Sequence, residues 1–100
     1  MSDFLNDASS IRRIVAIARE HGALTVSVFG SRARGDERPD SDLDLLVAVR
    51  PGTTLLDLIG METALSNLLG IDVEVVTVGG LHPRMKDHIL QEARPLVVAA

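Results

Sequence analysis

Hydrophobic residues recur over the first twenty positions at the spacing of one helix face. Ser9 or Ser10 can cap the start of this helix, and Gly22 can end it after about His21. A single buried stripe would run along it, formed by Ile11, Ile14, Val15 and Ala18.

Short runs rich in β-branched residues come next and are typical of buried strands. We expect strands at residues 24–29 (LTVSVF), 42–49 (DLDLLVAV) and 71–78 (IDVEVVTV). A polar loop over residues 30–41 separates the first two strands, with one helical turn after Gly30.

Helix signals flank the third strand on both sides. Thr54 and Asp57 resemble a capping box, and this helix should run to Leu69 and end at Gly70. Gly79-Gly80 breaks the third strand. Pro83 suits the first turn of a last helix, which Pro95 would stop.

The order of these elements predicts an α/β (α+β) domain over residues 1–100. The second strand, the helix after it and the third strand form a βαβ unit, which favours parallel strands. The first two strands have a shorter, polar link, so that pair can be antiparallel. We therefore expect a small mixed sheet of three or four strands with helices packed against it.

The amino-acid composition argues against several classes of function. The 100 residues carry a net charge of -4, only two aromatic side chains and no cysteine. A nucleic-acid surface would need a basic patch or stacking platform, and disulfides or thiolate metal sites need cysteine. No apolar run suits a membrane span and the N-terminus lacks signal-peptide features, so we expect a cytoplasmic protein without membrane or direct nucleic-acid partners.

Acidic residues interrupt two of the predicted strands. Side chains alternate between sheet faces, so Asp42 and Asp44 share one face of the second strand, and Asp72 and Glu74 share one face of the third. In parallel strands in register these acids would meet, and like charges repel unless a cation binds or a proton is kept. Mg²⁺ prefers one or two carboxylates together with substrate phosphates. The cluster therefore indicates half of a metal site, and a solvated sheet end is the alternative.

The turn after the first strand carries phosphate-binding chemistry. Gly30 lets a phosphate approach the backbone, and Ser31 adds a hydroxyl donor. Arg32 and Arg34 supply cationic forks for phosphate oxygens. The alternative is an ordinary β-turn with two solvated arginines.

The stretch "GSRARGDERPDSDLDLLV" resembles the signature of the nucleotidyltransferase superfamily that includes DNA polymerase beta. Nearly the whole chain is similar to the minimal MNT-type nucleotidyltransferases, antitoxin partners of HEPN toxins. The resemblance implies that Gly30 and Ser31 hold the triphosphate and that Asp42 and Asp44 bind Mg²⁺. Glu74 stands where the family usually has a third acid, an aspartate, which helps to activate the acceptor hydroxyl. Asp72, one pleat away, is the alternative third acid.

The resemblance implies an enzyme that uses two Mg²⁺ ions to transfer AMP from ATP to a hydroxyl. The acceptor would be a tyrosine of a HEPN toxin, so that modification makes the protein an antitoxin. The longer arm of Glu74 favours a rival in which catalysis is weak or lost and binding alone neutralises the toxin. A small-molecule nucleotidyltransferase of the aminoglycoside type is a third alternative, although such enzymes usually carry a second domain.

Other residues have structural interpretations. We expect His21, His82 and His88 at the surface or at helix caps. A solvated helix face would carry Arg84, Lys86 and Arg94. The core of the middle helix would contain Met61, Leu65, Leu68 and Leu69.

Overall fold

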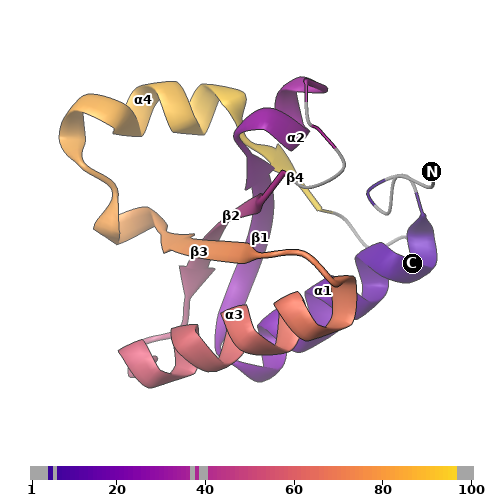
Figure 1. The fold of residues 1–100 in the computed structure, drawn as a ribbon. Coiled ribbons are helices and arrows are strands. Elements are labelled where there is room, and N and C mark those ends of the chain that lie inside the picture. Colours follow the sequence, from indigo (N-terminus) through magenta and orange to yellow (C-terminus); the bar gives the residue numbers. More distant parts are fainter. Residues whose placement is uncertain (1–4, 6, 37, 39–40, 97–100) are drawn as a thin grey trace.

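The computed structural model describes residue 5, residues 7–36, residue 38 and residues 41–96 (Figure 1). Part of the predicted polar loop, residues 37 and 39–40, lies outside the described residues. The helices are α1 (Ala8–Glu20), α2 (Ser31–Arg34), α3 (Leu55–Leu69) and α4 (Pro83–Glu92), and the 3₁₀ turn η2 covers Val78–Gly80. The strands are β1 (Ala23–Phe29), β2 (Leu43–Val49), β3 (Val73–Thr77) and β4 (Arg94–Pro95).

The described strands form one mixed sheet in the order β3-β2-β1-β4. β1 pairs antiparallel with β2, and β2 pairs parallel with β3, as predicted from the loop lengths. The short strand β4 was not predicted; it pairs antiparallel with β1 through Ser27↔Pro95 and Val28↔Arg94. Two residues are too few for a periodic pattern, so only tertiary pairing defines this strand.

Local signals placed most helix ends correctly. Thr54 and Asp57 form the predicted capping box, and Gly70 ends α3 with a left-handed backbone. The predicted cap of α1 was wrong. Asp7 is the N-cap, and its Oδ1 accepts a hydrogen bond from the Ser9 amide at 3.0 Å. The Asp7 carboxylate caps the helix two residues before Ser9 and the helix begins at Ala8, so Ser9 and Ser10 lie inside its first turn.

The third strand is shorter than predicted, and the last helix ends earlier. After Thr77 the chain turns through Val78–Gly80, and Thr77 Oγ1 accepts from the Gly80 amide at 3.1 Å. The two glycines let the backbone leave the sheet there. α4 ends at Glu92, before Pro95, because the following residues join β4.

The core lies between the sheet and the paired helices α1 and α3, which lie together at the bottom of the view in Figure 1. One face of β2 supplies Leu43, Leu45 and Val47, all fully buried. Against them pack buried residues of α1 and α3, namely Ile14, Ala18, Met61 and Leu65. Leu68, however, is exposed, so the prediction of a core role was wrong for this residue. It lies on the outer side of α3, which is apolar on more than one face.

Side chains of α3 complete the outer edge of β3. Ser66 Oγ accepts a hydrogen bond from the Val73 amide at 3.0 Å, and Glu62 Oε2 accepts from the Val75 amide at 2.8 Å. An edge strand otherwise presents unpaired amides to other chains. Glu74 lies between these two residues, so the contacts hold the segment that carries it.

Some of the residues predicted to lie at the surface or at helix caps make contacts that hold the fold. His82 caps α4 by accepting from the Arg84 amide, His21 ends α1, and His88 is exposed. Arg94 lies in β4 and not on a helix face, and its Nη1 donates to the Ala33 carbonyl at 3.3 Å. None of the described helices has the length and apolar character needed to cross a membrane.

Candidate active site

The turn after β1 is built around Gly30. Its φ of 78° lies in the left-handed region, and its carbonyl accepts from the amides of Ala33 and Arg34 to start α2. A Cβ at this position would collide with the carboxylate of Asp44. Only glycine tolerates both the backbone conformation and this approach. The turn and the first acidic strand therefore belong to one site.

The predicted meeting of acidic residues is confirmed for one pair, Asp44 of β2 and Glu74 of β3, whereas Asp42 and Asp72 lie just before these strands. The parallel register places Asp44 directly opposite Glu74. The charge of Glu74, and more weakly that of Asp42, acts on the Asp44 carboxyl group. Asp42 itself is exposed just before β2, on the same sheet face by alternation,.

Asp44 is a carboxylic acid that holds its proton unusually well. Burial is the largest cause and the charge of Glu74 the next, and together with weaker repulsion from Asp42 and Glu92 they raise its pKa from 3.8 to about 6. Desolvation and like charges both penalise the ionised form. A cation at this position would relieve both penalties.

Among the described residues, no group of three or more acidic, histidine or cysteine side chains is gathered closely enough to hold a metal ion alone. The close pair is Asp44 and Glu74, and pairs of carboxylates are what Mg²⁺ uses when substrate phosphates complete its shell. The donor set therefore fits a cation that arrives with a phosphate ligand.

The predicted phosphate-binding arginines point to different partners. Arg34 is half exposed and lies beside Gly30, whereas Arg32 is buried. The guanidinium of Arg32 donates to the Ser41 carbonyl from Nε at 3.2 Å and from Nη2 at 2.7 Å. This contact ties α2 to the segment that leads into β2. The nucleotide-binding role of Arg32 stays a prediction, as does that of Ser31, which opens α2.

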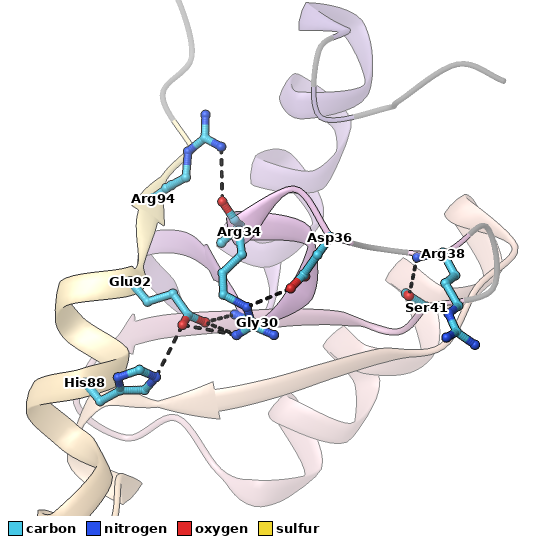
Figure 2. Close-up of polar contacts among 9 residues, drawn as sticks. Gly30, Arg34, Asp36, Arg38, Ser41, His88, Glu92 and Arg94 are labelled. Atoms are coloured by element: carbon cyan, nitrogen blue, oxygen red, sulfur yellow. Dashed lines mark hydrogen bonds and ion pairs between the residues drawn. The ribbon is translucent and has the colours of Figure 1, made fainter.

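Glu92 is part of this site, although no sequence signal pointed to it. Figure 2 shows its carboxylate against the Gly30 turn: Oε1 accepts from the Gly30 amide at 2.5 Å, and Arg34 Nη1 lies 3.1 Å from both carboxylate oxygens. His88 Nε2 lies 3.4 Å from Oε2. Burial opposes ionisation, but the bonds from Gly30 and Arg34 outweigh it and lower the pKa of Glu92. Glu92 is 62 residues from Gly30 in sequence, so only tertiary contact reveals the pair.

A separate hollow lies at the other end of β1 and β2, among His21, Gly22, Arg50, Thr53 and neighbouring residues. Gly22 precedes β1, whereas Gly30 follows it. The hollow is therefore a strand length away from Asp44, and we assign the chemistry to the Gly30 end.

Comparison with known proteins agrees with this assignment. A family model described as "Nucleotidyltransferase domain" matches residues 11–96. This range includes the candidate site residues Gly30, Asp42, Asp44 and Glu74. The chain belongs to this nucleotidyltransferase family.

Two relatives with known names are similar to this nucleotidyltransferase over most of its length. It is 43% identical over 82 residues to "Putative protein adenylyltransferase MJ0435" of Methanocaldococcus jannaschii, covering 82% of this chain and 88% of the relative. It is 37% identical over 71 residues to "Protein adenylyltransferase MntA" of Thermococcus cleftensis, covering 71% and 72%.

Solved structures confirm the fold. "Structure of putative minimal nucleotidyltransferase" superposes with a TM-score of 0.83 at 45% identity and covers 95% of this chain and 97% of that one. A complex of a tri-AMPylated Shewanella oneidensis HEPN toxin with an MNT antitoxin gives a TM-score of 0.68 at 15% identity, covering 89% and 70%. The second likeness is one of fold alone. The predicted MNT-type nucleotidyltransferase fold is thereby confirmed.

Proposed function

We propose that this nucleotidyltransferase is a Mg²⁺-dependent protein adenylyltransferase. It transfers AMP from ATP to a hydroxyl group, for which a tyrosine of a cognate HEPN toxin is the expected acceptor, and it acts as the antitoxin. The observation that carries the proposal is the position of Asp44, which lies against Gly30 and directly opposite Glu74. A phosphate turn and a carboxylate pair in contact are the two halves that nucleotidyl transfer requires.

The relatives support the finer parts of the proposal. MntA is named a protein adenylyltransferase and MJ0435 a putative one, and the Shewanella oneidensis complex contains an AMPylated HEPN toxin. We expect the active unit to be the domain of residues 1–100 and its location to be the cytoplasm.

The carboxylates would hold the metal. Asp42, Asp44 and Glu74 are the proposed ligands of two Mg²⁺ ions, which when bound neutralise the triphosphate and the charge that develops at the α-phosphorus. The raised pKa of Asp44 fits this role, because bound cations would favour its ionised form,.

Other groups of the chain would orient the reactants. The Gly30 amide, the Ser31 hydroxyl and Arg34 donate to phosphate oxygens, while Arg32 holds the turn to Ser41 and is a further candidate. The acceptor oxygen forms a bond to the α-phosphorus and releases its proton to Glu74. The bond from the α-phosphorus to the bridging oxygen breaks, and pyrophosphate leaves with the electron pair.

A second candidate function is neutralisation of the toxin by binding alone. The longer side chain of Glu74, at a position where the family usually has aspartate, favours it. The extra methylene would move its carboxylate by about one bond length or more, and errors near 1 Å can cost about a hundredfold in rate.

Labelled ATP distinguishes the two functions. The protein is incubated with [α-³²P]ATP, Mg²⁺ and a HEPN-type protein from the same genome, and the modified residue is found by mass spectrometry. Glu74→Asp should keep or raise the rate of transfer, and Glu74→Gln should lower it by about a hundredfold. Asp44→Asn should abolish transfer while the domain stays folded.

Asp87→Asn is the matched control, because it removes an exposed carboxylate of α4 away from β2 and β3. If wild type and all variants bind the toxin but none transfers AMP, binding alone is the function. If Glu74→Gln transfers at the wild-type rate, Glu74 is not the third acid and Asp72 is tested next.

A further inference from the structure

We propose that Glu92 is an internal competitor of the nucleotide at the Gly30 turn. This inference rests on the proposed function, which assigns the Gly30 amide and Arg34 to phosphate oxygens. In the structure both donors are engaged by the Glu92 carboxylate (Figure 2). A carboxylate oxygen and a phosphate oxygen are alike as acceptors of such bonds.

One amide hydrogen makes one good hydrogen bond, so the two anions exclude each other at Gly30. Charge acts in the same direction. Glu92 already adds to the repulsion that raises the pKa of Asp44. A triphosphate entering beside a retained Glu92 would meet a further negative group with its donors occupied.

The backbone around Glu92 aims its side chain at the turn. Glu92 is the last residue of α4, and β4 follows after Ala93. β4 is held beside β1 by its pairing and by the bond from the Leu96 amide to the Val26 carbonyl at 2.9 Å. Arg94 also binds the Ala33 carbonyl of α2. The carboxylate is thus held next to Gly30 without any local sequence relation.

Release of Glu92 needs movement of side chains alone. Arg34 has 49% of its side chain exposed and His88 has 74%, so both can follow a carboxylate that rotates outward. The Glu92 side chain is itself 11% exposed, at the boundary with solvent. The nucleotide affinity that is measured is then the intrinsic affinity multiplied by the fraction of molecules with the turn free.

A purely structural role for Glu92 predicts the opposite change in nucleotide affinity when Glu92 is replaced. If Glu92 only braces α4 against α2, its removal loosens the turn, and nucleotide binding weakens or is unchanged. If Glu92 competes, its removal frees the donors, and nucleotide binding tightens. Both roles lower the stability of the free protein, so stability does not separate them and affinity does.

The experiment is calorimetric titration of wild type, Glu92→Gln, Glu92→Ala and Asp87→Asn with MgATP and with Mg²⁺-tripolyphosphate. Asp87→Asn removes one negative charge from the same helix and corrects for the long-range effect of charge. Glu92→Gln keeps the shape of the side chain, so it covers the case in which Glu92→Ala fails to fold. We expect both Glu92 variants to bind both probes about tenfold more tightly than Asp87→Asn.

Affinity in the Glu92 variants equal to or weaker than in Asp87→Asn overturns the proposal, and so does failure of every protein to bind either probe. A chemical shift change of the Gly30 amide in Glu92→Gln, but not in Asp87→Asn, checks the contact itself. Transfer of AMP is assayed separately. Tighter binding without transfer leaves the competitor role intact and removes the proposed function, whereas transfer with unchanged affinity does the reverse.

Discussion

The Asp44 carboxyl group shows how residue-scale electrostatics enters the stability of the whole chain. Its pKa is about 6 in the folded protein against 3.8 for an unperturbed group. Between these values the folded protein keeps a proton that the unfolded chain has lost. The free energy of unfolding should therefore fall as the pH rises from about 4 to about 6.

We predict that this pH dependence is smaller in Asp44→Asn. The full shift corresponds to about 3 kcal/mol, and solvent screening at a partly exposed group reduces the expected difference to roughly 1 kcal/mol. Urea unfolding in EDTA at pH 4, 5, 6 and 7 measures it for wild type, Asp44→Asn and the control Asp87→Asn. A wild-type curve parallel to that of Asp44→Asn would show that Asp44 titrates normally.

Gly30 was correctly identified from sequence as a turn residue, but its strongest constraint comes from another strand. The sequence shows that glycine follows an apolar run and precedes a polar segment. The structure adds that Asp44 occupies the space a side chain would need. A residue-scale requirement is therefore imposed by the neighbouring element.

At the scale of elements, α3 and β3 act as one unit. The capping box of α3 could be predicted because Thr54 and Asp57 are three residues apart. The bonds from the β3 amides to Ser66 and Glu62 could not, because they depend on how the helix lies along the sheet edge. These contacts hold the strand on which Glu74 stands.

We predict that Ser66→Ala lowers the free energy of unfolding by about 1–2 kcal/mol, because the buried Val73 amide loses its acceptor,. Thr63→Ala, which also removes a hydroxyl from α3 but at an exposed position, is the control for the change in helix propensity,. Thermal and urea unfolding measure the difference. Equal effects of the two substitutions would mean that the edge contact contributes nothing.

At the scale of the whole molecule, the site joins segments from most of the chain. The turn follows β1, the acids lie on β2 and β3, and Glu92 comes from α4, with α2 and α4 lying toward the same side of the view in Figure 1. A ligand that bridges these elements would stabilise the whole fold. The reason is that binding to the folded state alone shifts the unfolding equilibrium.

We predict that ATP and Mg²⁺ together raise the melting temperature by more than either does alone. At a hundredfold excess over the dissociation constant the gain is about 2.7 kcal/mol, or on the order of 10 °C for a domain of this size. Scanning fluorimetry with ATP, Mg²⁺, both, and both with excess EDTA measures it. A full shift that persists in EDTA would contradict a metal-bridged site.

Features that depend on neighbours along the chain could be predicted from the amino-acid sequence. Helix α3 with its capping box, the turn at Gly30, the apolar stripe of α1 and the acid-bearing face of β2 all follow from residues a few positions apart. Alternation along strands and the βαβ crossover predicted that acids of the two strands share one sheet face, whereas the register that sets Asp44 directly opposite Glu74 comes from the tertiary structure,. These inferences succeed because turn, cap and pleat geometry are local.

Contacts between segments that are distant in sequence became known from the folded structure. These contacts include the pairing of β4 with β1 and the hydrogen bond from Arg32 to the Ser41 carbonyl. They also include the bonds from the β3 amides to Ser66 and Glu62, and the bond from the Gly30 amide to Glu92. Each depends on where one element packs against another, and many side chains of the same chemistry could have filled the position. Glu92 ends a helix, and no residue near it in the sequence indicates that its carboxylate contacts Gly30. The two residues are 62 positions apart, and packing alone brings them together.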